Sequence, residues 1–171
     1  MIIEGLKLPP FIKAPCHQNE ELAPGCAAAG RHQCFPKNLD TCAGLVHMYY
    51  SRTEENVDTI WSMIYAEVAK VASECPASNA EERLEIMQCL TIFLLLQADD
   101  PQSYEANDIG FLLTVAIDTY YDLALTQEWR DELPNTRPLY REWIFRETMR
   151  RSLSLMIYWF STHILMLIVG S

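Results

Sequence analysis

The last quarter of the chain, Arg137 to Gly170, constrains the fold more than any other segment. It begins with a cluster of arginines and continues as an almost unbroken apolar run. A helix with this pattern is stable in water only when its apolar side chains are covered. We therefore expect the remaining elements of the chain to pack against this segment or around it.

The same segment raises the question of a membrane span. The apolar stretch from Leu153 to Val169 has seventeen residues, which is the lower limit of length for a transmembrane helix. Arg150 and Arg151 precede it and provide the positive charge that often flanks such a helix. Ser161, Thr162 and His163 interrupt the run near its middle. This polar triplet favours a buried helix, and we predict that a membrane location is unlikely.

Composition indicates a helical protein. Half of the 171 residues are hydrophobic and only six are glycine, while long stretches carry Leu, Met, Ala, Glu and Gln. Five of the nine prolines precede residue 39, where no sustained periodicity is present. We predict an all-α fold, a bundle of about five helices over 39–171, preceded by an extended Pro-rich N-terminal arm over 1–38 that packs on the bundle.

The spacing of apolar residues and the residues that start or end helices predict where the helices lie. They are expected over about 39–51, from 53 to Pro76, from 78 to Asp100, over roughly 107–127, and from Pro138 onward. Ser78 and Glu81 have the spacing of a capping box. The apolar run Ile92–Leu96 predicts a helix buried on all sides, and therefore a central one. In the arm, we expect a short helical turn near Asn19 to Leu22.

Three further details follow from the same pattern. The fourth helix is expected to bury a face made of Phe111, Val115, Ala116, Tyr120 (or Thr119) and Leu123, with Gln127 as a further candidate. Leu6, Leu8, Phe11 and Ile12 are expected to anchor the arm on the helical body. Pro138 is expected in the first turn of the last helix, where its missing N–H costs nothing.

Charge argues against nucleic acid as a partner. The net charge is −10, and the acidic excess lies before Arg130. A phosphate backbone is normally met by a basic face, so we predict no direct nucleic-acid binding. The acidic residues are interpreted as a solvated surface.

The six cysteines do not form a standard metal motif, since no C-x-x-C pair occurs among them. The first four follow one another every eight to ten residues, with His17, His32 and His47 among them. This spacing leaves a non-standard metal site open between Cys16 and Cys42. Ordinary thiols in a reducing compartment are the favoured interpretation, so we predict no metal and no cofactor.

The acidic residues and the potential nucleophiles do not indicate a catalytic site any more clearly than the cysteines indicate a metal site. Asp99, Asp100 and Glu105 could hold a divalent cation, but a solvated helix end and turn is the favoured interpretation. No local signature of a nucleophile and its base is present, and no glycine-rich phosphate loop occurs. Catalytic residues are therefore unknown, and the interpretation leans away from an enzyme.

Three segments resemble the C-terminal regulatory region of fungal zinc-cluster (Zn2Cys6) transcription factors. They are Leu8-Pro-Pro-Phe-Ile12 with Pro15-Cys16, the stretch from Leu39 through Arg52-Thr53 to Glu67, and Trp143-Ile-Phe-Arg-Glu147-Thr-Met-Arg150-Arg151. The resemblance implies a helical regulatory domain of a nuclear or cytoplasmic protein. The six-cysteine DNA-binding cluster of that family is absent from this sequence. The resemblance thus implies a fragment, a truncated regulator, or a scaffold reused in a biosynthetic (secondary-metabolism) pathway.

Two functions are compatible with these observations. The leading prediction is a non-enzymatic domain that acts through protein contacts, with a protein partner or as a homodimer through the apolar C-terminal helix. Glu147, Arg150 and Arg151 would then form a structural polar network. The alternative is a small-molecule-binding protein or enzyme with a pocket among helices three to five. The aromatic residues proposed to line this pocket are Trp61, Tyr65, Tyr120, Tyr121, Trp143 and Tyr158.

Overall fold

The structure is a computed structural model that describes residues 8–12, 14, 16, 23–125 and 140–169, with side chains in the last helix described for 143–158. Within these ranges every regular element is helical and no strand occurs. The predicted all-α fold is confirmed. The elements are α1 (Pro24–Ala29), α2 (Lys37–Tyr50), α3 (Val57–Glu74), η2 (Cys75–Ala77), α4 (Ala80–Asp99), η3 (Pro101–Tyr104), α5 (Ile109–Leu125) and α6 (Tyr140–Val169).

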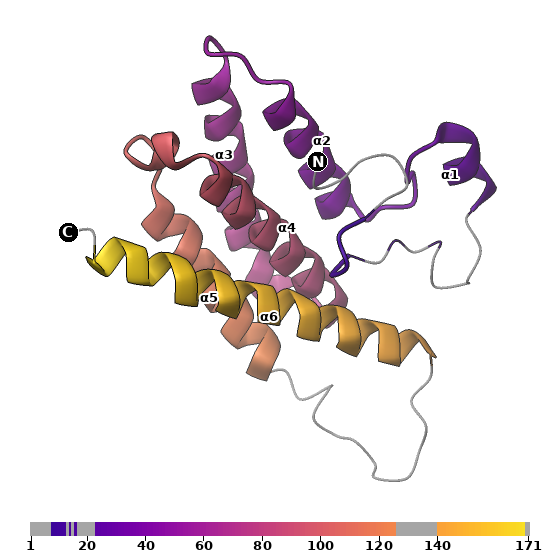
Figure 1. Ribbon diagram of the computed structural model, residues 1–171. Coiled ribbons are helices and arrows are strands. Elements are labelled where there is room, and N and C mark those ends of the chain that lie inside the picture. Colours follow the sequence, from indigo (N-terminus) through magenta and orange to yellow (C-terminus); the bar gives the residue numbers. More distant parts are fainter. Residues whose placement is uncertain (1–7, 13, 15, 17–22, 126–139, 170–171) are drawn as a thin grey trace.

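Helix α4 is the central element of the bundle. It contacts α2, α3, α5 and α6, and α6 lies across α4 and α5 (Figure 1). The segment from Ile86 to Leu94 is buried without interruption, including Phe93 and Leu90 at 0% exposure. The apolar run from Ile92 therefore predicted the central helix correctly, because such a helix has no polar face to turn toward solvent.

The N-terminal end of α4 differs by one residue from the sequence prediction. The N-cap is Asn79, whose Oδ1 accepts the Glu82 N–H at 3.0 Å. The Glu82 carboxylate in turn accepts the Asn79 N–H at 3.0 Å. The predicted pair of Ser78 and Glu81 is therefore wrong, since Ser78 instead donates its hydroxyl to the Glu74 carbonyl at 3.0 Å. Asn is as good an N-cap as Ser, so the sequence alone did not distinguish the two registers.

Helix α5 also buries a slightly different face from the predicted one. Val115, Ala116, Thr119 and Leu123 are buried as expected, but Leu112 takes the place expected for Phe111. Phe111 is 37% exposed, whereas Leu112 is 0% exposed. The prediction of Phe111 as a core residue is wrong. Adjacent apolar residues on a helix point about 100° apart, and only the packing against α4 decides which one faces inward.

The N-terminal arm is held against the bundle by its own apolar residues. Phe11 and Ile12 are buried in the main core, as predicted. The buried Gln88 of α4 donates Nε2 to the Phe11 carbonyl at 2.8 Å. Figure 1 shows α1 on the side of the molecule where the arm and the start of α2 meet. This short helix was not predicted.

Some predictions fall outside the described residues. These are the helical turn at Asn19 to Leu22, the anchoring role of Leu6, the burial of Gln127, and the place of Pro138 at the start of the last helix. Among the helices of the described ranges, none combines the length and the apolar character that crossing a membrane requires.

Candidate functional site

The aromatic residues predicted to line one pocket occupy separate places in the bundle. Trp61 and Tyr65 of α3 pack beside Tyr49 of α2, with the Tyr49 and Trp61 ring centroids 5.4 Å apart. The Trp61 indole donates to Asp100 Oδ2 at 3.1 Å, and the Tyr65 hydroxyl donates to Gln97 Oε1 at 3.3 Å. Burial raises the pKa of Tyr49 to about 12 and raises that of Tyr65 as well. These residues form a packed, hydrogen-bonded end of the core.

Tyr120 and Tyr121 lie elsewhere, at a hollow between α5 and α6. The hollow has a volume of about 240 Å³, and its lining is mainly apolar. It is lined by Ile117, Tyr120, Tyr121, Met156 and Ile157. Tyr158 follows Ile157 and is 69% exposed, while Trp143 is 51% exposed nearer the start of α6. The hollow is therefore lined by two of the six predicted aromatic residues, Tyr120 and Tyr121.

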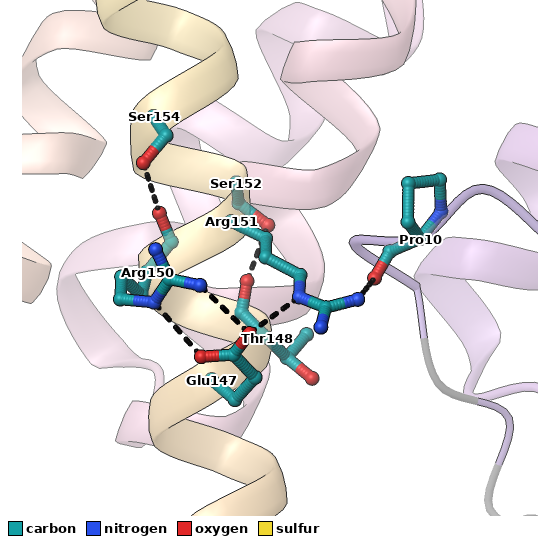
Figure 2. Close-up of polar contacts among 7 residues, drawn as sticks. All are labelled: Pro10, Glu147, Thr148, Arg150, Arg151, Ser152 and Ser154. Atoms are coloured by element: carbon teal, nitrogen blue, oxygen red, sulfur yellow. Dashed lines mark hydrogen bonds and ion pairs between the residues drawn. The ribbon is translucent and has the colours of Figure 1, made fainter.

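The predicted polar residues of α6 form one connected group (Figure 2). Glu147 accepts two hydrogen bonds from Arg150 at 2.8 Å and one from Arg151 Nε at 2.6 Å. These bonds lower the pKa of Glu147 to about 2, because hydrogen bonds to the carboxylate favour its charged form. The group is a surface ion-pair network on one helix, since the Arg150 side chain is 67% exposed.

Arg151 also connects α6 to the arm. Its Nη1 donates to the Pro10 carbonyl at 3.1 Å, as Figure 2 shows. The neighbouring Phe11 carbonyl is bound by Gln88 of α4. Two consecutive carbonyls of the arm are thus held by two different helices, so the position of the arm depends on the assembled bundle.

A second group of polar side chains, made of cysteines and a histidine, lies in the part of the arm that follows Pro10 and Phe11. The side chains of Cys16, Cys26, His32 and Cys34 converge there, and their donor atoms all lie within 4.8 Å of one another. The Cys16 Sγ is 3.3 Å from the His32 Nδ1, and the Cys34 Sγ is 3.9 Å from the same nitrogen. Cys16, Cys26 and His32 are buried and Cys34 is partly buried. We call these four residues the Cys/His cluster.

The pKa values of two thiols in the cluster are shifted in opposite directions. The Gln33 backbone N–H donates to the Cys26 Sγ at 3.3 Å, and this bond lowers the pKa of Cys26. Burial raises the pKa of Cys34 to about 11. A backbone donor aimed at sulfur stabilises the negative charge of a thiolate.

The Cys/His cluster corresponds to the alternative that the sequence analysis did not favour. That alternative placed a metal site between Cys16 and Cys42, with His17, His32 and His47 as further candidates. The structure instead buries Cys42 in the main core and leaves His47 exposed on α2, while His17 lies outside the described residues. The spacing of nine, five and one intervening residues matches no short motif. The one feature of the sequence that pointed to the cluster was the high density of Cys and His within the first 38 residues, a segment too short to build a core of its own.

Comparison with known proteins adds no assignment, because no protein family model, no curated protein and no solved structure matches the chain significantly. Two places in the structure have a geometry that bears on function. These are the α5–α6 hollow with its exposed rim and the Cys/His cluster of the arm.

Proposed function

We propose that this chain is a non-enzymatic helical interaction domain that binds a second copy of itself through α5 and α6. The observation that carries the proposal is the apolar hollow between these helices, with large apolar side chains exposed beside it. Tyr121 is 57% exposed and Ile157 is 54% exposed, and both line the hollow. Exposed apolar side chains around a concavity are typical of protein-binding surfaces.

The size of the hollow favours a protein side chain over a small molecule. Pockets for drug-sized ligands measure about 300–1,000 Å³ and bring a few polar groups together. The α5–α6 hollow is smaller, at about 240 Å³, and mainly apolar. One apolar or aromatic side chain of a partner fits such a space, as an anchor residue does at the centre of an interface.

The proposal of self-association is supported by the presence of a hollow and an exposed aromatic side chain on the same stretch of α6. Tyr158 is exposed directly after Ile157, which lines the hollow. A two-fold interface brings the same surface of both copies together, so the projecting residue of each copy can enter the hollow of the other.

The resemblance noted in the sequence extends the proposal to a cellular role. The chain would be a regulator of transcription in a fungal cell, nuclear or cytoplasmic, without the zinc cluster that reads DNA in the family it resembles. It would act on a pathway such as secondary metabolism through protein contacts and without binding nucleic acid itself. The sequence segments in the arm, in α2–α3 and in α6 support this extension.

The alternative function, a small-molecule-binding protein or pathway enzyme, has less support. Its six predicted lining residues are distributed between the packed end of α3, the hollow and the exposed surface of α6. A ligand that bound at the hollow would therefore contact Tyr120 and Tyr121 but not Trp61 or Tyr65.

A sedimentation-velocity concentration series on the full chain tests the proposal. We expect a reversible dimer, and we expect Ile157→Asp to weaken dimerisation at least about tenfold, since a charge would be buried at the apolar centre of the interface. The matched control is Met63→Asp, because Met63 is also an exposed apolar side chain but lies on α3. A wild-type chain that stays monomeric up to about 100 μM overturns the proposal. An equal effect of both substitutions also overturns it.

A further inference from the structure

The donor atoms of the Cys/His cluster have the spacing of a single metal site. In a tetrahedral zinc site with Zn–S bonds of about 2.3 Å and Zn–N bonds of about 2.0 Å, neighbouring donors lie about 3.5–3.8 Å apart. The distances of 3.3 Å and 3.9 Å from His32 Nδ1 to the Cys16 and Cys34 sulfurs bracket this range. All pairs lie within 4.8 Å, so one ion reaches the four donors after only small side-chain movements.

The types of donor select the metal. Three thiolates and one imidazole form a soft set without any carboxylate, which suits Zn²⁺ and excludes hard cations such as Mg²⁺ and Ca²⁺. Four protein ligands leave no open position for a substrate or for a reactive water, and this is the arrangement of a structural site. The Gln33 N–H that points at the Cys26 sulfur offsets part of the negative charge that three thiolates would bring.

The surroundings of the cluster give an independent reason for a metal. Among the described residues, its apolar core consists of Ala14, Cys16 and Cys26, with four partly buried apolar residues packed against it. These four residues are Leu8, Ala23, Cys34 and Phe35. The adjoining helix α1 has six residues, and no side chain caps its N-terminus. A helix this short is not stable by itself, and segments with so small a core usually require a disulfide or a metal.

We propose that Cys16, Cys26, His32 and Cys34 bind one Zn²⁺ ion in a closed tetrahedral site that holds the N-terminal arm in place. The ion joins three parts of the arm. These are the backbone at Cys16, helix α1 at Cys26, and the segment of residues 31–36 that leads into α2. Binding displaces a proton from each cysteine that is still a thiol. This proposal is independent of the α5–α6 interface.

The site would act together with the anchors on the bundle. Arg151 and Gln88 bind the Pro10 and Phe11 carbonyls, a few residues before Cys16. The arm is thus fixed at one end by α4 and α6 and at the other by the metal. Removal of the metal should release residues 23–35 and leave the α2–α6 bundle folded, because most of the large buried residues lie in the bundle.

Metal content of the full chain, purified under reducing conditions, is the first test. We expect about one zinc per chain, and we expect Co²⁺ in its place to give the intense visible bands of a tetrahedral thiolate site. Cys16→Ser, Cys26→Ser, Cys34→Ser and His32→Ala should each lower zinc affinity about 100-fold or more. The matched control is Cys75→Ser, since Cys75 is an equally buried cysteine of the main core, and this variant should keep one zinc.

Hydrogen exchange with and without a strong zinc chelator is the second test, and it uses the wild-type chain alone. Protection of residues 23–35 should be lost on chelation, while protection of α4 should persist. Zinc binding that is equal in wild type and the four ligand variants overturns the proposal, and so does a wild-type chain that binds no zinc. A disulfide among these cysteines in the reduced, metal-supplied protein, or preferential retention of iron, also overturns it.

Discussion

The bundle and the N-terminal arm reach a folded state by different means. In the bundle, α4 is surrounded by α2, α3, α5 and α6, and long apolar side chains exclude water from its whole middle section. In the described part of the arm, a three-residue apolar cluster is combined with the Cys/His cluster and two hydrogen bonds to the bundle. Apolar burial grows with the size of the unit, so a short segment must rely on specific links.

A substitution in the core of the bundle should have the largest effect on stability. Phe93→Ala should lower the free energy of unfolding by about 3–5 kcal/mol, because Phe93 is fully buried and its removal leaves a cavity. Phe111→Ala is the matched control, with 37% of Phe111 exposed, and should cost no more than about 1–2 kcal/mol. Urea denaturation followed by circular dichroism measures both values. Equal losses would show that α4 is not the centre of the core.

The connection between the two regions should be weaker than the core itself. Gln88→Ala removes the donor to the Phe11 carbonyl and should cost about 1–3 kcal/mol, because a buried acceptor is left without its partner. Hydrogen exchange should become faster in residues 8–12 and remain slow in the middle of α4. Gln102→Ala, at an exposed glutamine of η3, is the control and should leave both unchanged. Faster exchange across α4 would contradict a separation between arm and bundle.

The stability of the bundle should depend on pH near neutrality. Burial, together with Glu82 and Glu81, raises the pKa of Glu85 from 4.5 to about 7. The folded state therefore binds this proton more tightly than the unfolded state, so the stabilisation is complete below pH 4.5 and is lost as the pH rises through 7.

Glu85→Gln should remove this pH dependence. We expect the substitution to stabilise the protein at pH 8 by about 1 kcal/mol, a fraction of the full linkage value because water still screens a partly buried carboxylate. At pH 4.5 it should have little effect. Thermal denaturation at the two pH values measures the difference, with Glu54→Gln as the control, because Glu54 is exposed and does not contribute to the raised pKa of Glu85. An unchanged pH profile in the Glu85 variant would show that another group is responsible.

The two regions also differ in how far they could be predicted. Most of α2, α3 and α5 follows from apolar periodicity, which shows the side of each helix that must be covered, and α4 follows from its unbroken apolar run. The choice between Phe111 and Leu112 depended on packing against α4, whereas Ser78 and Asn79 offered two capping registers that the sequence alone did not distinguish. The aromatic residues assigned to one pocket failed to form a single set for the same reason. Helical spacing places a residue on a face, but it does not say which neighbour that face meets.

What the sequence by itself determined is an all-helical bundle with α4 at its centre, because a long apolar run in a helix is stable only when it is covered on all sides. Only the tertiary structure decided that Cys16, Cys26, His32 and Cys34 meet at one point. The nine-, five- and one-residue gaps between them carry no local signal. Their convergence depends on tertiary contacts of the arm, which Gln88 and Arg151, far along the chain, hold at the Phe11 and Pro10 carbonyls.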